Sequence, residues 1–99
     1  MDRRLFDRYL GNALYEARVV KRITQSEISK KANEVWLNKY SPNRKKGASR
    51  STYTRYESGE ISMPMGFFKS ACDVLGLDWR KVFSEAQHYE MNHIDELKD

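Results

Sequence analysis

Short apolar stripes at helical spacing, each bounded by residues that start or stop a helix, limit what this chain can fold into. The members of the first stripe are Leu5, Phe6, Tyr9, Leu10, Ala13, Leu14 and Ala17. Apolar side chains that recur every three or four residues form one buried face of an α-helix. The pattern predicts a first helix over about residues 3–20, with Asp2 as its N-cap.

The second helix has a specific start signal. Residues 24–27, Thr-Gln-Ser-Glu, are a capping box, in which the Thr and Glu side chains satisfy each other's free backbone amides. The apolar positions that follow are Ile28, Ala32, Val35, Trp36 and Tyr40. We therefore expect a helix that starts at Gln25 and runs towards Asn38.

Residues 41–48, SPNRKKGA, break the helical pattern and predict a surface loop. A proline disfavours helix in the residue before it, and a basic run has nothing to bury. Ser49 is then a second N-cap, and Tyr53 and Tyr56 face inwards from a third helix. Gly59 supplies the left-handed conformation that ends this helix.

Two more helices are predicted after residue 60. Pro64 suits the first turn of a fourth helix, and Gly76 ends it. Its apolar members are Met65, Phe68, Ala71, Cys72 and Leu75. Asp78 caps a fifth helix, with Trp79, Val82, Phe83 and Ala86 as its apolar members. The lone Cys72 is interpreted as a small core residue rather than a reactive thiol.

Composition agrees with one all-α domain. The chain has 99 residues, of which 39% are hydrophobic and 32% charged, as in a folded helical protein rather than a disordered one. No apolar run is long enough for a membrane span, and the N-terminal segment lacks the apolar run of a signal peptide. We expect a cytoplasmic protein.

Charge is unevenly distributed. Residues 1–62 hold 14 Lys and Arg against 7 Asp and Glu, a balance of +7, whereas residues 63–99 hold 4 against 7, a balance of −3. A basic N-terminal part and an acidic C-terminal part suggest that one face of the protein meets a polyanion and the other meets solvent or protein.

Three segments resemble the XRE family of helix-turn-helix regulators, related to the lambdoid phage repressors and Cro. They are Arg18, the run 24–29 (TQSEIS) and the run 49–59 (SRSTYTRYESG). The resemblance covers about residues 5–83. It implies a five-helix lambda-repressor-like DNA-binding domain in residues 1–83, with the second and third helices as the motif and residues 84–99 as a C-terminal helical extension or tail.

The third helix offers a polar outward face for reading double-stranded DNA. Its residues are Arg50, Ser51, Thr54 and Arg55. Arginine matches the paired acceptors on the major-groove edge of guanine, so Arg50 and Arg55 are the predicted base readers. Ser51 and Thr54 would assist or contact phosphate, and the alternative for either arginine is a contact to phosphate alone.

Phosphate contacts are predicted from amide and hydroxyl side chains near helix ends. Gln25 is the first of these, because the resemblance gives its position both a phosphate contact and a bracing role. Thr24, Thr52 and Ser58 are predicted to contact phosphate as well. Ser58 resembles the family's phosphate-binding turn after the third helix, and the negative charge of Glu60 would weaken phosphate binding there.

The resemblance also pairs Arg18 with Glu57 in a buried salt bridge. Such a bridge would join the first helix to the third and orient it, without touching DNA.

The connection between the two helices departs from the family, whose turn has three or four residues. This chain has sixteen residues from Asn33 to Ala48, including a basic insertion at about 39–48. We expect Trp36, Tyr40 and the cluster Arg44, Lys45 and Lys46 to lie beside the DNA face, where the cluster would add phosphate or minor-groove contacts. The alternative is a solvated loop that touches nothing.

Other function classes find little support in the sequence. No catalytic motif is visible, no cofactor is expected, and His88 and His93 are too poorly spaced on a helix to suggest a metal site. RNA binding is a minor alternative, because the aromatic residues have helical core spacing.

Apolar residues between 79 and 97 predict a protein partner. A homodimer fits best, because one such motif reads only a few base pairs and a twofold dimer would cover a pseudo-palindromic operator. The simplest mechanism is a prokaryotic or phage repressor at the nucleoid, and activation of transcription is the alternative. The alternative is an antitoxin-type autoregulator that binds a second protein through its C-terminal region.

Overall fold

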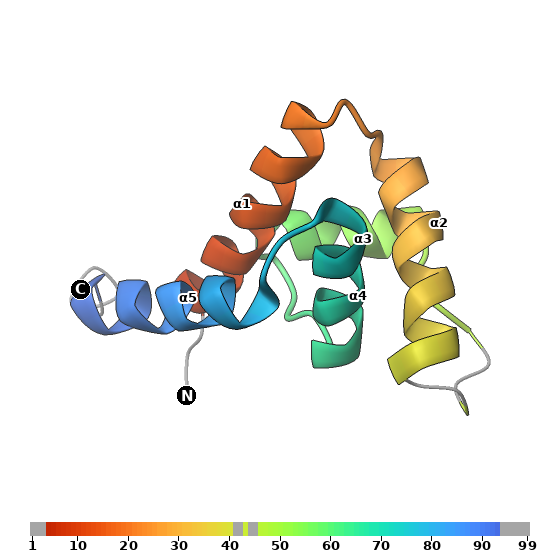
Figure 1. Ribbon diagram of the computed structural model, residues 1–99. Helices are drawn as coiled ribbons and strands as arrows, with labels where there is room; N and C mark the ends of the chain where they lie inside the picture. The colour runs from red at the N-terminus through yellow and green to blue at the C-terminus, as the bar shows by residue number, and fades with distance from the viewer. Residues whose placement is uncertain (1–3, 41–42, 44–45, 94–99) are drawn as a thin grey trace.

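The computed structural model describes residues 4–40, 43 and 46–93, and it is an all-helical bundle (Figure 1). Its elements are α1 (Arg4–Val20), α2 (Gln25–Val35), the π-helical turn η1 (Trp36–Tyr40), α3 (Arg50–Ser58), α4 (Met65–Leu75) and α5 (Trp79–His93). No strand occurs in these described ranges. The predicted all-α class is confirmed.

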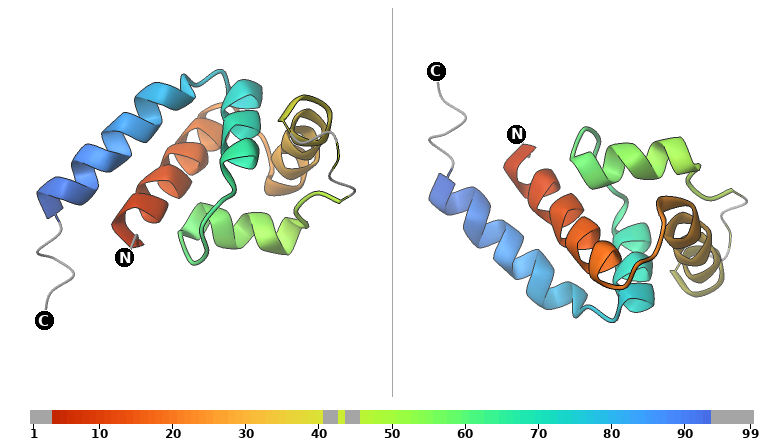
Figure 2. Two further views of the ribbon diagram at one scale, coloured as in Figure 1. Left: turned by 90° about the horizontal axis from the view of Figure 1, so that it is seen from below. Right: turned by 90° about the horizontal axis from the view of Figure 1, so that it is seen from above.

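The helices form two packed pairs with α3 across one side. Helices α1 and α5 lie side by side and antiparallel, and α2 packs on α4. Both views of Figure 2 place α3 along the side of the bundle opposite the turn between α4 and α5. This arrangement leaves one long face of α3 uncovered.

The predicted helix starts and stops are confirmed where they can be compared. The Thr24 side chain accepts from the Glu27 amide and the reciprocal bond is also present, while the Ser49 side chain accepts from the Thr52 amide. Gly59 ends α3 with a φ of 79°. Pro64 differs slightly, because it is the extended N-cap of α4 rather than a residue of its first turn.

Phe67 is the aromatic centre of the core, and the sequence pattern did not predict it. The side chain is fully buried, with the rings of Trp36, Tyr53 and Tyr56 at centroid distances of 5.6, 6.0 and 5.2 Å. By contrast Met65, predicted to be apolar core, is 38% exposed. The physical reason is that α4 packs against both α2 and α1, so its buried arc is wider than one stripe.

The expected position of Trp36 and Tyr40 beside the third helix's polar face is wrong. Trp36 is 2% exposed and lies edge-on to Phe67, and the Tyr40 hydroxyl bonds Asp73 on α4 at 2.9 Å. Both residues lie in η1, which prolongs α2 and packs on α4. Burial of a large aromatic ring against α4 outweighs leaving it at a polar surface.

Helix α5 runs without a break through the predicted boundary at residue 83. Ala86 is fully buried, and the Tyr89 ring lies 5.4 Å from that of Tyr9 on α1. Residues 84–93 therefore share the packing of the bundle.

Cys72 is buried, and burial raises the pKa of its thiol to about 12, in agreement with a core role.

Gly11 lets α1 approach the end of α3, because a Cβ there would lie 2.6 Å from the Tyr56 carbonyl oxygen and closer still to that of Glu57. We expect Gly11→Ala to lower the free energy of unfolding by about 2 kcal/mol, since overpacking against backbone outweighs the gain of about 1 kcal/mol in helix propensity. Urea unfolding would measure the change. Asn12→Ala, at the next and exposed position, is the control, and equal stability of the two variants would contradict the close approach.

Candidate nucleic-acid interface

The outward face of α3 is held by a buried face of the same helix. Tyr53 and Tyr56 are 0% and 7% exposed and fix the helix against the core. All four residues of the predicted reading face are exposed, and we call them the α3 polar face: Arg50, Ser51, Thr54 and Arg55. The two arginines and two hydroxyls present hydrogen-bond donors and acceptors along one exposed face of α3.

Gln25 braces α3 from the start of α2. Its side-chain amide donates to Glu57 Oε1 at 3.2 Å, and its oxygen accepts from the Thr54 hydroxyl at 2.9 Å. Both contacts use the polar end of the side chain, so they fix which way the amide points. The bracing half of the predicted role is therefore present in the folded chain.

Thr54 is more constrained than the sequence suggests. Its hydroxyl proton is directed to Gln25 or to the Arg50 carbonyl oxygen, at 2.9 and 3.1 Å. What remains for a ligand is the hydroxyl oxygen as an acceptor. Thr54 is thus better suited to accept a hydrogen bond than to donate one.

The predicted ion pair between Arg18 and Glu57 is confirmed. Arg18 Nε and Nη2 donate to the two Glu57 carboxylate oxygens at 3.0 and 2.8 Å, and Nη1 donates to the Ile23 carbonyl oxygen at 3.0 Å. The two side chains are 14% and 7% exposed. A bidentate pair this well covered joins α1 to α3 with little freedom.

Burial alone would raise the pKa of the Glu57 carboxyl, but hydrogen bonds from Arg18 and Gln25 outweigh it and hold that pKa below its usual value. Because the pKa of Glu57 is lower in the folded state, its carboxylate contributes its full stabilisation above the unfolded-state pKa of about 4.3. That stabilisation is lost as the pH falls below this value. We expect wild-type stability to fall more steeply below that pH than the stability of Glu57→Gln. Parallel slopes in urea unfolding would contradict the assignment.

Arg55 is paired in the free protein. Its Nη2 lies 3.3 Å from Glu60 Oε1, and both side chains are more than half exposed. An exposed pair of this kind is worth at most about 1 kcal/mol, so a ligand can displace it. Glu60 therefore reduces the net contribution of Arg55 to binding an anion.

Three more of the predicted phosphate residues use their hydroxyls for hydrogen bonds within the protein. The Thr24 hydroxyl belongs to the capping box of α2, and the Thr52 hydroxyl oxygen accepts from Ser49 at 3.0 Å. The Ser58 hydroxyl donates to the Arg55 carbonyl oxygen at 3.1 Å. Thr24 and Ser58 are exposed and Thr52 is half-buried, so all three can still be reached from outside.

Asn33 fastens the end of the insertion to α2. Its amide donates to the Ala48 carbonyl oxygen at 2.6 Å, and its oxygen accepts from the Ala48 amide at 2.9 Å. The exposed Lys46 lines a hollow with Ser49 and Thr52 at the start of α3. Arg44 and Lys45 lie outside the described residues.

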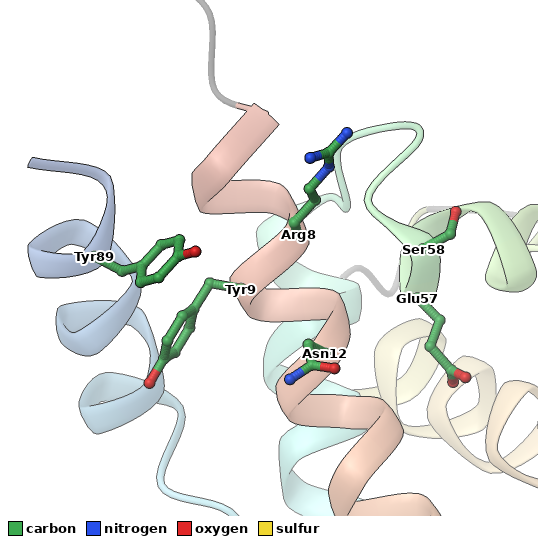
Figure 3. Close-up of a pocket in the computed structure, with 6 residues that line it drawn as sticks. All are labelled: Arg8, Tyr9, Asn12, Glu57, Ser58 and Tyr89. Carbon is green, nitrogen blue, oxygen red and sulfur yellow. The ribbon is translucent and has the colours of Figure 1, made fainter. Parts of the chain in front are cut away.

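A cleft at the C-terminal end of α3 adds residues that were not predicted from the sequence. It has a volume of about 500 Å³ and lies between α1, the end of α3 and α5. Figure 3 shows Arg8 pointing towards the turn that holds Ser58, with Asn12 one turn further along α1. The sequence could have indicated these two residues, because Arg8 and Asn12 are four positions apart and so share the polar face of the first helix.

Other kinds of site are not seen in the described part of the chain. No group of three His, Cys, Asp or Glu side chains gathers there to hold a metal. His93 stacks on Tyr89 with ring centroids 4.2 Å apart, and its Nδ1 lies 2.9 Å from the Tyr89 carbonyl oxygen. None of the described helices has the length and apolar character needed to cross a bilayer.

Comparisons with protein families, with curated proteins and with solved structures find no match to this chain. Its function is therefore inferred from its own residues and geometry.

Proposed function

We propose that this chain is a sequence-specific double-stranded DNA-binding regulator with a lambda-repressor-like helix-turn-helix formed by α2 and α3. The observation that carries the proposal is the exposed α3 polar face, held at a fixed orientation by Gln25 and by the partly buried Arg18–Glu57 pair. A helix that enters the major groove needs such a rigidly mounted row of polar side chains.

The start of α2 supports the same docking. Free backbone amides at a helix N-terminus favour a phosphate, and Gln25 lies there beside α3. With α3 in the groove, the start of α2 would meet the DNA backbone, while Arg8 and Asn12 would lie along the same edge. Phosphate contacts of this kind set the register and leave base reading to Arg50 and Arg55.

The simplest mechanism is repression by covering a promoter. One short helix reads only a few base pairs, so a twofold dimer would place two copies of α3 about 34 Å apart, or a multiple of that distance, on a pseudo-palindromic site. No partner or effector is needed for this mechanism beyond the operator and a second copy.

Competition between nucleic acids tests the proposed class of ligand. We expect duplex DNA to displace a bound fluorescent duplex far better than duplex RNA of the same sequence, because a helix fits the DNA major groove and not the deep, narrow one of RNA. Equal competition by RNA would contradict the proposal.

The basic insertion is proposed to add phosphate contacts. Lys46 lies next to the N-cap of α3, so a DNA backbone that passes the start of α3 would come within its reach. Neutralising Arg44, Lys45 and Lys46 to Gln should reduce the slope of log affinity against log salt by about 0.9 for each phosphate that these cations neutralise in the wild type. Lys81→Gln on α5 is the control. A slope unchanged by the triple substitution would show that the loop stays in solvent.

A further inference from the structure

A second basic surface lies on the side of the bundle away from α3. It is built from η1, α4 and the start of α5, and we call it the basic–aromatic patch: Lys39, Tyr40, Lys69, Asp73, Trp79 and Arg80. Figures 1 and 2 show α4 and the start of α5 on one side of the bundle and α3 on the other. The patch therefore takes no part in the proposed DNA contact.

The cations of the patch are held by its two rings. Lys69 Nζ lies 4.5 Å from the Trp79 ring centre and 5.8 Å from that of Tyr40. Arg80 lies 5.1 Å from the Trp79 ring and Lys39 lies 5.1 Å from the Tyr40 ring. Cation–π contacts restrict these side chains and so lower the entropy cost of binding an anion.

The arrangement favours an acidic protein segment over a nucleic acid. Two cations lie within about 6 Å of the centre of each ring, with Lys69 shared between them, so a base that stacked on either ring would compete with contacts already made. Asp73, 3.2 Å from Lys39, would oppose a continuous run of phosphates. Trp, Tyr and Arg together are typical of the central residues of protein–protein interfaces.

The chain itself contains a complementary segment. Residues 94–99 read Ile-Asp-Glu-Leu-Lys-Asp, with three acidic residues against one lysine, and with the two apolar residues Ile94 and Leu97 on either side of the acidic pair. The patch has the inverse balance, with three cations against one carboxylate.

This segment cannot reach the patch of its own chain with its acidic pair. Helix α5 begins at the patch and leads away from it (Figure 1), and from Trp79 to His93 it extends about 21 Å, at 1.5 Å per residue. The backbone from His93 to Glu96 spans at most about 11 Å. Asp95 and Glu96 that bind the patch must therefore come from another copy.

We propose that the basic–aromatic patch of one copy binds residues 94–99 of a second copy, and that the exchange is reciprocal. Both copies of α3 stay uncovered in such a twofold dimer, because the patch and α3 lie on opposite sides. The inference rests on the proposed function and deepens it by naming the surface that would form its dimer.

Sedimentation of the full chain without DNA tests the proposal. The wild type should dimerise, and both Lys69→Glu/Arg80→Glu and Asp95→Lys/Glu96→Lys should dimerise at least about tenfold more weakly, because like charges then face each other. An equimolar mixture of these two variants should form a dimer again, since each patch then meets a segment of opposite charge. Lys30→Glu/Lys31→Glu, the same charge change on α2, should dimerise like the wild type.

A wild type that stays monomeric, a charge-reversed variant that dimerises normally, or a mixture that does not recover would each overturn the proposal. If Lys69→Glu/Arg80→Glu fails to fold in a thermal melt, the Asp95→Lys/Glu96→Lys variant decides by itself. No DNA is present, so a failed dimer test leaves base reading by α3 open, and a failed DNA test leaves the dimer open.

Discussion

The Arg18→Ala substitution is expected to lower the free energy of unfolding by about 3 kcal/mol relative to the wild type. Removing one partner of a buried ion pair costs about 3–5 kcal/mol, because the remaining charge is left without compensation. We expect the lower end of that range, since the pair is only partly buried and Gln25 still donates to the Glu57 carboxylate at 3.2 Å. Urea unfolding at neutral pH measures the change.

Two further variants make this result specific. Arg22→Ala, an exposed arginine in the turn after α1, should change stability by less than about 0.5 kcal/mol. Arg18→Met/Glu57→Leu removes both charges and should recover much of the stability. If Arg18→Ala matches Arg22→Ala, the ion pair does not join α1 to α3 in solution.

Replacement of Arg50 by alanine should have the largest effect on DNA recognition. A bidentate contact to guanine discriminates against other bases by about 1–3 kcal/mol, so preference for the best site over a site with that base changed should fall by about 5- to 150-fold. Arg55→Ala should cost less, because Arg55 must first leave Glu60. Fluorescence anisotropy with matched and changed duplexes measures both.

The same experiment separates base-specific contacts from the electrostatic binding of any duplex. Lys81→Ala on α5 removes one positive charge away from α3 and should leave the preference intact. Glu60→Gln should strengthen binding by a few fold, because it frees Arg55 and removes a charge that repels phosphate. If Arg50→Ala weakens binding to all duplexes equally, Arg50 contacts phosphate and not a base.

Local chemistry explains why much of the fold could be predicted from the sequence. The Thr24 capping box, the Ser49 N-cap and the Gly59 C-cap depend on residues a few positions apart, and all three are present. Phe67 and Trp36 depend instead on which helix faces which. No stripe in a single segment shows that α4 is covered from two sides or that η1, which prolongs α2, packs on it.

The candidate site divides in the same way. The exposed positions of Arg50 and Arg55 follow from the periodicity of one helix, with Tyr53 and Tyr56 opposite them. The bond from Thr54 to Gln25 joins residues 29 positions apart, and it could not be predicted without knowing how α2 meets α3. The pair of Arg18 and Glu57 joins residues 39 positions apart, so no local spacing rule could predict it.

Selection of binding sites from random duplex DNA tests the central claim most directly. If α3 reads bases in the major groove, repeated binding and amplification should enrich a pseudo-palindrome whose two halves contain guanine and whose centres are about 10 base pairs apart or a multiple of that. The wild-type protein should then prefer this site to unrelated duplexes by about a thousandfold or more. A final pool with no enriched motif would contradict the proposed function.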